Sequence, residues 1–298
     1  MRQQLQDLLQ KRVQQYVTNS RHSTKESEKI EKKIISLDNR QAEIVKVNAK
    51  GYIDKFHQTS PEVENVQYHV HLQYLIKQKN YVYLEEEIEF RLAEFYKGVL
   101  VQDQEMNPLI FDDNRTLAEP PEDPVESEER AGYQYDRMKA VQYAERWWND
   151  YNPAYKKFEV DCTNYISQCL HQGEAPMRGY PNRVNGWWMQ NNNWSYTWSV
   201  AHSLRWFLEN SKTGLRGNPV SSPEELSIGD VICYDFEGDG RFNHNTIVTG
   251  KDANGMPLVN AHTFNSRMRY WAYEDSSAYT PNIKYKFFKI VDDQKQKK

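Results

Sequence analysis

The chain has few cysteines, no long apolar run and no large excess of charge of one sign. Its 298 residues include three cysteines, which leaves at least one thiol unpaired, and there is no C-x-x-C pair or histidine cluster of the kind that holds zinc. Free thiols are more typical of a reducing compartment than of an oxidising one. No stretch predicts a membrane span, and the N-terminus lacks the apolar core of a signal peptide. A net charge of −4 and a pI near 6.1 offer nucleic acid or an anionic membrane no electrostatic attraction.

From these absences we expect a cytoplasmic protein that binds neither nucleic acid nor membrane, although association with the cell envelope stays open. No metal or organic cofactor is expected. The partner of the N-terminal part cannot be read from the sequence.

The composition changes sharply along the chain. All eight tryptophans and all three cysteines lie after residue 146. The stretch from Leu117 to Arg130 contains six acidic residues, three prolines and a single basic residue. Such a stretch predicts a linker, and an ordered surface loop is the alternative. We therefore predict an accessory domain at 1–118, an acidic proline-rich linker at 119–132 and a second domain at 133–298.

The accessory domain is predicted to be a small α+β domain with a curved antiparallel sheet. Residues 5–17 have helical spacing, and residues 65–103 alternate between apolar and polar side chains as strands do. His69 and His71 share one strand face and are possible metal ligands, but no third ligand accompanies them.

The most informative stretch of the second domain reads D-C-T-N-Y-I-S-Q-C and spans residues 161–169. Cys162 follows a short β-like run, Lys157–Val160, and precedes an amphipathic helix predicted over Thr163–His171. The backbone N–H groups and the positive dipole of a helix start favour a thiolate there, and the same N–H groups could hold an oxyanion. Asp161 is either a helix N-cap or a supporting carboxylate.

The alternative for any cysteine is a small buried hydrophobe. Cys169 lies on an apolar helix face and Cys233 lies within a strand pattern, so both fit that alternative. Cys162 differs because its neighbours are polar and because it stands at a helix start. We therefore take Cys162 as the candidate nucleophile.

A candidate base appears 82 residues later in the run R-F-N-H-N-T-I-V. His244 opens a β-branched segment, Thr246–Thr249, that predicts a core strand. A cysteine at a helix start and a histidine at a strand start are suited to nucleophilic catalysis. The next predicted strand offers two groups that could orient the imidazole, His262 and Asn260, which are two residues apart and so share a face.

Two other segments keep alternative interpretations. The aromatic and asparagine-rich segment Gly179–Trp206 either fills a core or lines a groove for peptide or sugar. The run D-F-E-G-D-G-R-F-N partly imitates a calcium loop, but Thr246 stands where the bidentate glutamate belongs. We predict a hairpin turn there, and whether Asp235 and Asp239 bind calcium stays open.

Three stretches together resemble the bacterial amidase-domain family, which is similar in pattern to papain-like cell-wall amidases and endopeptidases, including CHAP domains. They read D-C-T-N-Y-I-S-Q, S-I-G-D-V-I-C-Y-D-F-E-G-D-G-R-F-N-H-N-T-I-V and L-V-N-A-H-T-F-N-S, and the resemblance covers roughly residues 133–290. It implies Cys162 as nucleophile, His244 as general base and His262 as the third polar residue. Asn164 and Gln168 match polar positions of the motif without an assigned role.

The fold expected from this resemblance is α+β, with N-terminal helices packed on an antiparallel sheet as in papain-like cysteine amidases. The expected activity is cysteine-dependent hydrolysis of amide or peptide bonds, and the expected substrate is a peptide or peptidoglycan-like molecule. The alternative is a catalytically inactive module on the same fold that holds peptide or glycan in its aromatic groove. A transferase using the same thioester is a third possibility.

Overall fold

The computed structural model describes residues 1–18, 25–106, 133–263 and 265–292. The chain divides into two compact units, which we treat separately. The first is drawn from Met1–Pro108, Asp252–Asn254 and Phe264–Tyr279, and the second from Leu109–Lys251, Gly255–Thr263 and Thr280–Lys298. Two short C-terminal stretches thus join the first unit instead of the second domain to which the sequence assigns them. The expected linker at 119–132 lies outside the described residues.

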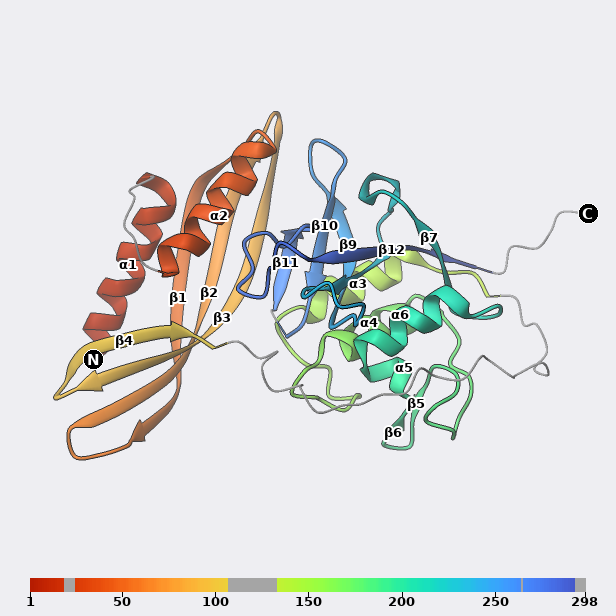
Figure 1. Cartoon of the computed structure of the whole chain (residues 1–298), viewed down its shortest axis with the longest axis horizontal. Helices are drawn as coiled ribbons and strands as arrows, with labels where there is room; N and C mark the ends of the chain where they lie inside the picture. The colour runs from red at the N-terminus through yellow and green to blue at the C-terminus, as the bar shows by residue number, and fades with distance from the viewer. Residues whose placement is uncertain (19–24, 107–132, 264, 293–298) are drawn as a thin grey trace, which may run out of the picture. The chain divides into compact units, whose positions relative to one another are not determined.

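The first unit combines helices with long antiparallel strands (Figure 1). Strand β2 pairs with β1 and with β3, and β3 also pairs with β11 along one half and with β4 along the other. The elements are α1 (Arg2–Thr18), α2 (Lys25–Asn39), β1 (Ala42–Gln58), β2 (Val63–Gln78), β3 (Tyr81–Tyr96), β4 (Val99–Glu105) and β11 (Ser266–Tyr270). The sequence does not predict β1, because every side chain from 50 to 58 is exposed and no buried face alternates there.

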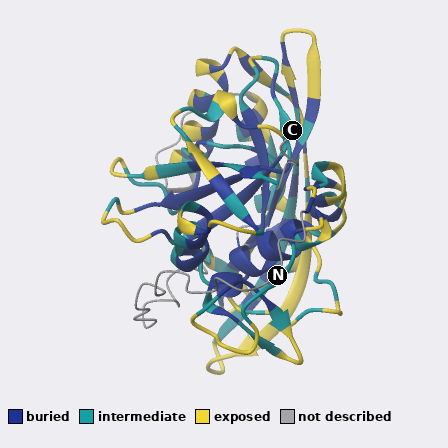
Figure 2. Ribbon diagram, turned by 90° about the vertical axis from the view of Figure 1, so that its right-hand side faces the viewer, coloured by how far each residue is buried: buried dark blue, intermediate teal, exposed yellow. Residues whose placement is uncertain are grey.

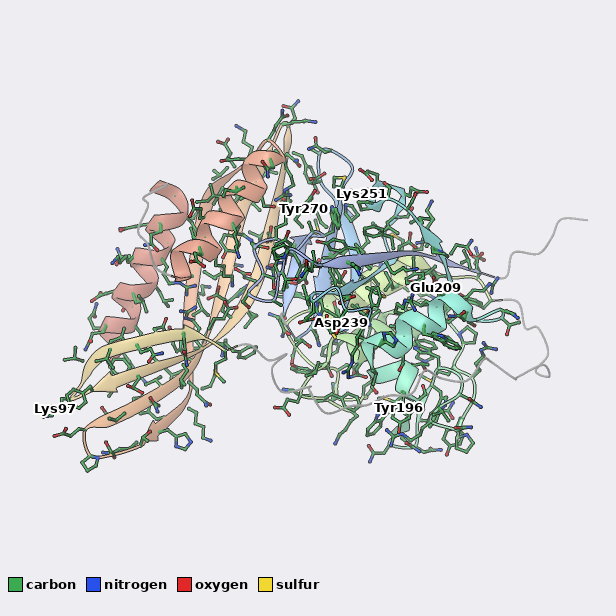
Figure 3. The ribbon with its side chains drawn as sticks, viewed as in Figure 1. Lys97, Tyr196, Glu209, Asp239, Lys251 and Tyr270 are labelled. Carbon is green, nitrogen blue, oxygen red and sulfur yellow. The ribbon has the colours of Figure 1, made fainter. Side chains whose placement is uncertain are left out.

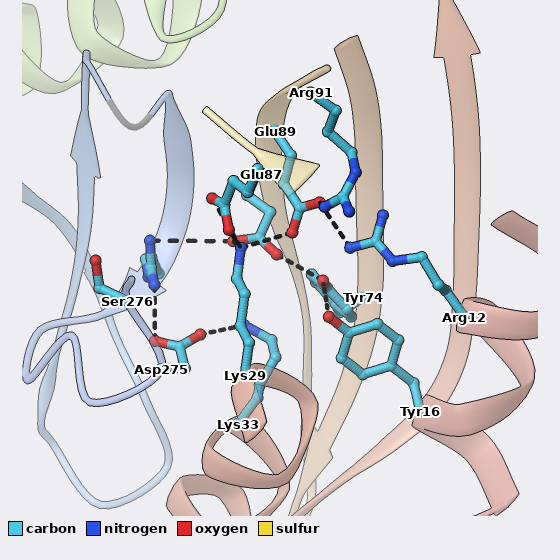
Figure 4. Close-up of polar contacts among 12 residues, drawn as sticks. Arg12, Tyr16, Lys29, Lys33, Tyr74, Glu87, Glu89, Arg91, Asp275 and Ser276 are labelled. Atoms are coloured by element: carbon cyan, nitrogen blue, oxygen red, sulfur yellow. Dashed lines mark hydrogen bonds and ion pairs between the residues drawn. The ribbon is translucent and has the colours of Figure 1, made fainter. Parts of the chain in front are cut away.

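In β3 the charged face is the buried one. Phe90 is 39% exposed, whereas Glu89 is 2% exposed. Cations from both helices reach this face: Arg12 Nη2 lies 2.7 Å from Glu89 Oε2, and Lys29 Nζ lies 2.5 Å from Glu89 Oε1. Figure 4 shows the wider polar network, which includes Tyr16, Lys33, Tyr74, Glu87, Arg91 and Asp275. Carboxylates are buried when they are paired, so ion pairing decides the orientation of β3.

The second unit packs helices against one face of an antiparallel sheet whose strand order is β10-β9-β8-β12-β7. Its elements are α3 (Arg137–Trp147), α4 (Cys162–Gln172), β5 (Met189–Gln190), β6 (Asn193–Trp194), α5 (Tyr196–Ser199), α6 (Ala201–Asn210), β7 (Arg216–Val220), η2 (Pro223–Glu225), β8 (Val231–Asp235), β9 (His244–Lys251), β10 (Pro257–Ala261) and β12 (Lys284–Val291). The described part of this unit is therefore α+β with an antiparallel sheet.

Alternation along the strands of the second unit selects the face that meets the helices. Val231 and Cys233, two residues apart on β8, and Ile247 on β9 share one core cluster with side chains of α3, α4 and α6. Figure 2 shows these strands and the inner sides of the helices as largely buried. At the edge of this layer, Glu209 of α6 (labelled in Figure 3) pairs with Lys286 of β12 at 2.8 Å.

Most predicted elements of the second unit are present, with differences at their ends. The run Lys157–Val160 is not a strand. The N–H of Phe158 instead donates to Asp161 Oδ1 at 3.0 Å, which turns the chain into α4. The strand predicted to carry both Asn260 and His262 ends at Ala261, so His262 lies in the turn that follows. In the described part of the chain, no helix is long and apolar enough to cross a membrane.

Candidate active site

Cys162 is the first residue of α4 and is only 2% exposed. Its Sγ lies 3.7 Å from Thr163 Oγ1. Burial raises the pKa of the Cys162 thiol, and hydrogen bonds from Thr163, the backbone of Asn245 and Thr263 oppose that rise without cancelling it. The sequence predicts an easily ionised thiol because it shows the helix start. It cannot show that loss of solvent outweighs the helix start.

The two backbone N–H groups at the start of α4 share one acceptor. The N–H of Asp161 donates to Thr263 Oγ1 at 3.0 Å, and the N–H of Cys162 donates to the same oxygen at 3.1 Å. Thr263 has φ +73°, a left-handed conformation that β-branched residues rarely adopt. The donors that the sequence proposes for an oxyanion are therefore bonded to Thr263 in this state.

His262 is held between α3 and the start of α4. Its Nδ1 lies 2.9 Å from Asp161 Oδ2, its Nε2 lies 2.6 Å from the Trp147 carbonyl oxygen, and its ring stacks on Tyr165 with centroids 4.0 Å apart. A carbonyl oxygen only accepts, so Nε2 is the donor in the contact with Trp147, and Nδ1 faces the Asp161 carboxylate. Asp161 makes this contact instead of an N-cap bond to α4.

Both ring nitrogens of His262 are thus engaged by groups other than His244. The bond from the His244 ring to His262 stays a prediction, and it needs a different arrangement from the one seen here.

His244 is the first residue of β9 and is fully buried. Its ring packs against Tyr234, with centroids 5.6 Å apart, and against Phe236 at 5.9 Å. The side chain of the next residue, Asn245, donates to Thr163 Oγ1 at 3.0 Å. Successive residues of a strand face opposite sides, so Asn245 reaches the α4 side of the sheet. The structure brings the start of β9 to Cys162 through Asn245, whose backbone is among the contacts that lower the pKa of the thiol.

Asn260, the alternative orienting group, lies on β10 and joins two neighbouring elements. Its Oδ1 accepts a bond from Thr249 Oγ1 of β9 at 2.8 Å, and its Nδ2 donates to Glu145 Oε1 of α3 at 2.9 Å. These bonds connect the sheet to α3.

Asn164 acquires a clear structural role. Its Nδ2 donates to the Lys156 carbonyl oxygen at 2.9 Å and to Asp161 Oδ1 at 2.8 Å, and its Oδ1 accepts from Trp198 Nε1 at 2.8 Å. This one amide therefore ties α4 and α5 to the segment that precedes Cys162.

Gln168 is linked through the Tyr143 hydroxyl to the beginning of the same segment. Its Oε1 accepts from the Tyr143 hydroxyl at 2.6 Å, and that hydroxyl oxygen accepts from Asn152 Nδ2 at 2.9 Å. Asn164 and Gln168 thus hold the two ends of the stretch 152–156 against α4. The sequence marks both residues as polar positions but cannot show what they bind.

A pocket of about 430 Å³ lies between this segment and the β5–β6 hairpin. Its lining includes the basic side chains of Lys156 and Lys157 and the half-buried ring of Trp194, and no acidic residue contributes to it. The ring of Phe158, close before Cys162 in the chain, packs edge-on against Trp194 with centroids 4.8 Å apart. The pocket therefore adjoins the segment that leads directly into the candidate nucleophile.

The aromatic segment contributes both to the core and to the pocket, and a peptide or sugar ligand stays a prediction. Three of its rings lie in the protein interior without exposed surface: Trp187, Trp188 and Trp198. Trp194 instead lines the pocket.

The other candidate ligands are engaged within the protein. His69 Nδ1 lies 2.7 Å from Asp54 Oδ1, and His71 Nε2 lies 2.8 Å from Glu86 Oε2. Asp235 accepts backbone N–H bonds from the turn that follows it, as expected for a hairpin turn. Within the described residues, no group of three or more His, Cys, Asp or Glu side chains is arranged to hold a metal ion.

Comparison with known proteins identifies the class to which the chain belongs. Residues 134–288, just over half of the chain, match the family model described as "Putative amidase domain". The chain therefore belongs to this amidase-domain family, and the match includes Cys162, His244 and His262.

Two relatives come from Bacillus subtilis (strain 168). "Uncharacterized protein YhbB" is 53% identical over 270 residues, which is 89% of this chain and 86% of that protein. "Uncharacterized protein YjcM" is 28% identical over 140 residues, which is 44% of this chain and 31% of that protein. No solved structure matches the chain significantly. The family and the α+β class are established, and the papain-like assignment stays a prediction.

Proposed function

We propose that the protein is a cysteine-dependent hydrolase of amide or peptide bonds, with Cys162 as nucleophile and His244 as general base. The observation that carries the proposal is the surroundings of Cys162: a helix start, two hydroxyl groups and the first residues of β9 meet at its thiol. A helix start favours the thiolate that nucleophilic catalysis by a cysteine needs, and β9 is the strand that begins with His244. Membership in the amidase-domain family supports an amide as the substrate.

The proposed reaction follows the acyl-transfer sequence of a thiol hydrolase. His244 takes the Cys162 proton, and the thiolate forms a carbon–sulfur bond to the amide carbonyl carbon. The resulting imidazolium gives that proton to the nitrogen as the carbon–nitrogen bond breaks, which releases the amine and leaves a thioester. Water then hydrolyses the thioester to a carboxylic acid and restores the thiol.

The state described here precedes that reaction. Cys162 is buried, the helix-start donors bind Thr263, and the His244 ring packs against Tyr234 and Phe236. Substrate binding must therefore expose the thiol, and the proposed reaction needs the His244 imidazole within hydrogen-bond reach of the sulfur.

The pocket lined by residues 153–157, which precede Cys162 in the chain, supports a peptide as the substrate. The Trp194 ring offers apolar contact, and Lys156 and Lys157 favour a carboxylate-bearing chain. A peptidoglycan-like peptide, which carries such carboxylates, fits this chemistry. The 152–156 stretch that Asn164 and Gln168 hold in place would form one wall of the substrate site.

A non-catalytic binding module is the second candidate. The buried thiol with its raised pKa and the engaged nitrogens of His262 favour it, because such a site is not ready for chemistry. In that case the pocket holds peptide or glycan without cleaving it, and Cys162 serves packing alone.

Amine release from a panel of acidic and neutral peptides separates the two candidates. The wild-type protein should release new amino groups and Cys162→Ser should release none. Cys169→Ser should still release them, because that thiol lies in the core cluster and its replacement changes stability and not chemistry. Binding of the same peptides without amine release by any of the three proteins would favour the binding module.

A further inference from the structure

The hydrogen-bonding capacity of Thr263 is almost fully used at the start of α4. A threonine hydroxyl has two acceptor lone pairs and one hydrogen. The N–H groups of Asp161 and Cys162 occupy both lone pairs, at 3.0 and 3.1 Å. What remains is the hydroxyl hydrogen, so Thr263 can add one bond only as a donor. Its two N–H partners also polarise the hydroxyl, which makes it a stronger donor.

The Cys162 sulfur is the acceptor that this hydrogen serves best. The thiol belongs to the residue whose N–H already fixes the Thr263 oxygen, and its environment offers few other donors: the Thr163 hydroxyl and the backbone of Asn245. A hydrogen bond from Thr263 is among the contacts that lower the pKa of the buried thiol.

We propose that Thr263 is a positioning residue for the nucleophile: its hydroxyl, fixed by the two N–H groups that begin α4, donates to the Cys162 sulfur and stabilises the thiolate. The catalytic meaning of this role rests on the proposed function, whereas the effect on the thiol does not.

Charged and titratable groups lie on the elements around the thiol. Asp161, on the same helix start, disfavours a second negative charge, although His262 draws part of its charge away. On β8, Cys233 is buried and its raised pKa keeps it neutral. On β9, His244 stands beside Asn245 with its ring against aromatic side chains. The hydrogen bonds that lower the pKa of the Cys162 thiol come from neutral groups, those of Thr163, Asn245 and Thr263.

The backbone of Thr263 also indicates that the side chain is needed. A residue at φ +73° would ordinarily be glycine, since a β-branched side chain is strained in that region. Here the strained conformation places a hydroxyl on two helix-start donors, and the residue is buried.

The test measures how fast iodoacetamide alkylates Cys162 as the pH changes, with the labelled residue located by mass spectrometry. Thr263→Val removes the hydroxyl at nearly constant shape, and Thr263→Ser keeps it. Because a hydrogen bond to a charged group shifts an ionisation equilibrium by roughly tenfold or more, we expect Thr263→Val to lower the Cys162 thiolate population by about that factor at a given pH. Thr263→Ser should keep the wild-type pH profile within about twofold, because the donor is retained.

Thermal unfolding followed by circular dichroism, together with the absence of label on Cys169 and Cys233, shows that each variant is folded. If Thr263→Val does not fold, Thr263→Ala provides the same comparison with less disturbance of the strained backbone. An unchanged pH profile in the folded variant that lacks the hydroxyl would overturn the proposal, because Thr263 would then only satisfy the helix start. Faster alkylation would also overturn it, because the hydroxyl would then block the sulfur.

Labelling needs no turnover, so the two proposals can fail separately. A shifted pH profile in a protein that cleaves no amide would leave the role of Thr263 standing and reject the proposed function.

Discussion

Replacing His262 with alanine tests what this residue does. In the structure His262 is the partner of the buried Asp161 carboxylate and of the Trp147 carbonyl oxygen. His262→Ala leaves that carboxylate buried without its ion-pair partner and removes the ring that stacks on Tyr165. Breaking a buried pair in this way costs about 3–5 kcal/mol of unfolding free energy. We therefore expect a large loss of stability in the second unit.

Asp161→Asn provides the matched partner of this experiment. If the cost arises from an uncompensated charge, adding Asp161→Asn to His262→Ala should recover about 1–3 kcal/mol, since a neutral amide is less costly to bury than a carboxylate. Asp161→Asn alone should destabilise the protein, because it weakens the contact with His262. The two changes are therefore expected to be non-additive.

Urea unfolding followed by tryptophan fluorescence measures these values. Seven of the eight tryptophans lie in the second unit, so the signal reports chiefly on that unit. A loss below about 1 kcal/mol for His262→Ala would refute the stabilising role, because breaking a buried ion pair costs more than that. The same holds if Asp161→Asn recovers no stability in the His262→Ala background.

The sequence predicts a different outcome for the same residue. If His262 only orients His244, His262→Ala should lower turnover by about 10²-fold or more while barely changing substrate binding. Asn260→Ala should then cost little beyond local packing. If Asn260→Ala instead loses most of its turnover and His262→Ala keeps nearly all of it, the orienting role belongs to Asn260.

Three further predictions follow from the site and the fold. Cys162→Ser and His244→Ala should each abolish amide hydrolysis with the fold retained, as judged by amine release and circular dichroism, whereas Cys169→Ser should change stability only; full activity in Cys162→Ser would reject the mechanism. Because burial raises the pKa of the Cys162 thiol, wild-type alkylation should be slow at about pH 6 and rise with pH; fast labelling there would show that solvent reaches the thiol more readily than in this structure. Burial alone would raise the pKa of Glu86, but hydrogen bonds, led by the one from His71, lower it to about 2. Glu86 therefore stabilises the first unit fully above its unfolded pKa of 4.5, and this stabilisation is lost as the pH falls toward 2. Glu86→Gln should reduce the dependence of stability on pH in this range, as measured by circular dichroism.

The parts of the fold that follow from local pattern were predictable from the sequence. Val66, Val70 and Leu72 alternate along β2 and are buried as that spacing predicts. The helix after Cys162 and the strand that His244 opens are also found, because each has a clear apolar period and polar residues at its start.

The parts that depend on partners distant in sequence were not predictable. The buried side of β3 is set by cations on α1 and α2, so the apolar rule alone selects the wrong face. The run Lys157–Val160 resembles a strand in composition, yet the bond from the Phe158 N–H to Asp161, together with the bond from Asn164 to the preceding Lys156 carbonyl, holds this part of the chain in a turning path.

The site shows the same division between local and distant information. The sequence identifies Cys162 and the start of its helix. The thiol pKa also depends on burial, which the sequence does not show and which raises the pKa here. Nothing local marks Thr263, because a left-handed backbone and a bond to a helix about one hundred residues earlier arise only in three dimensions. The order of His244 and His262 along the chain could be read, but the faces that they occupy could not.

Trapping the acyl-enzyme tests the central claim most directly. The protein is mixed with a cleavable peptide, quenched in acid within the first turnover and digested for mass spectrometry. We expect the acyl fragment of the peptide to be attached to Cys162, with one equivalent of amine released and no adduct in Cys162→Ser. Amine release at the wild-type rate from Cys162→Ser, or an adduct on another residue, would contradict the assignment of Cys162 as the nucleophile.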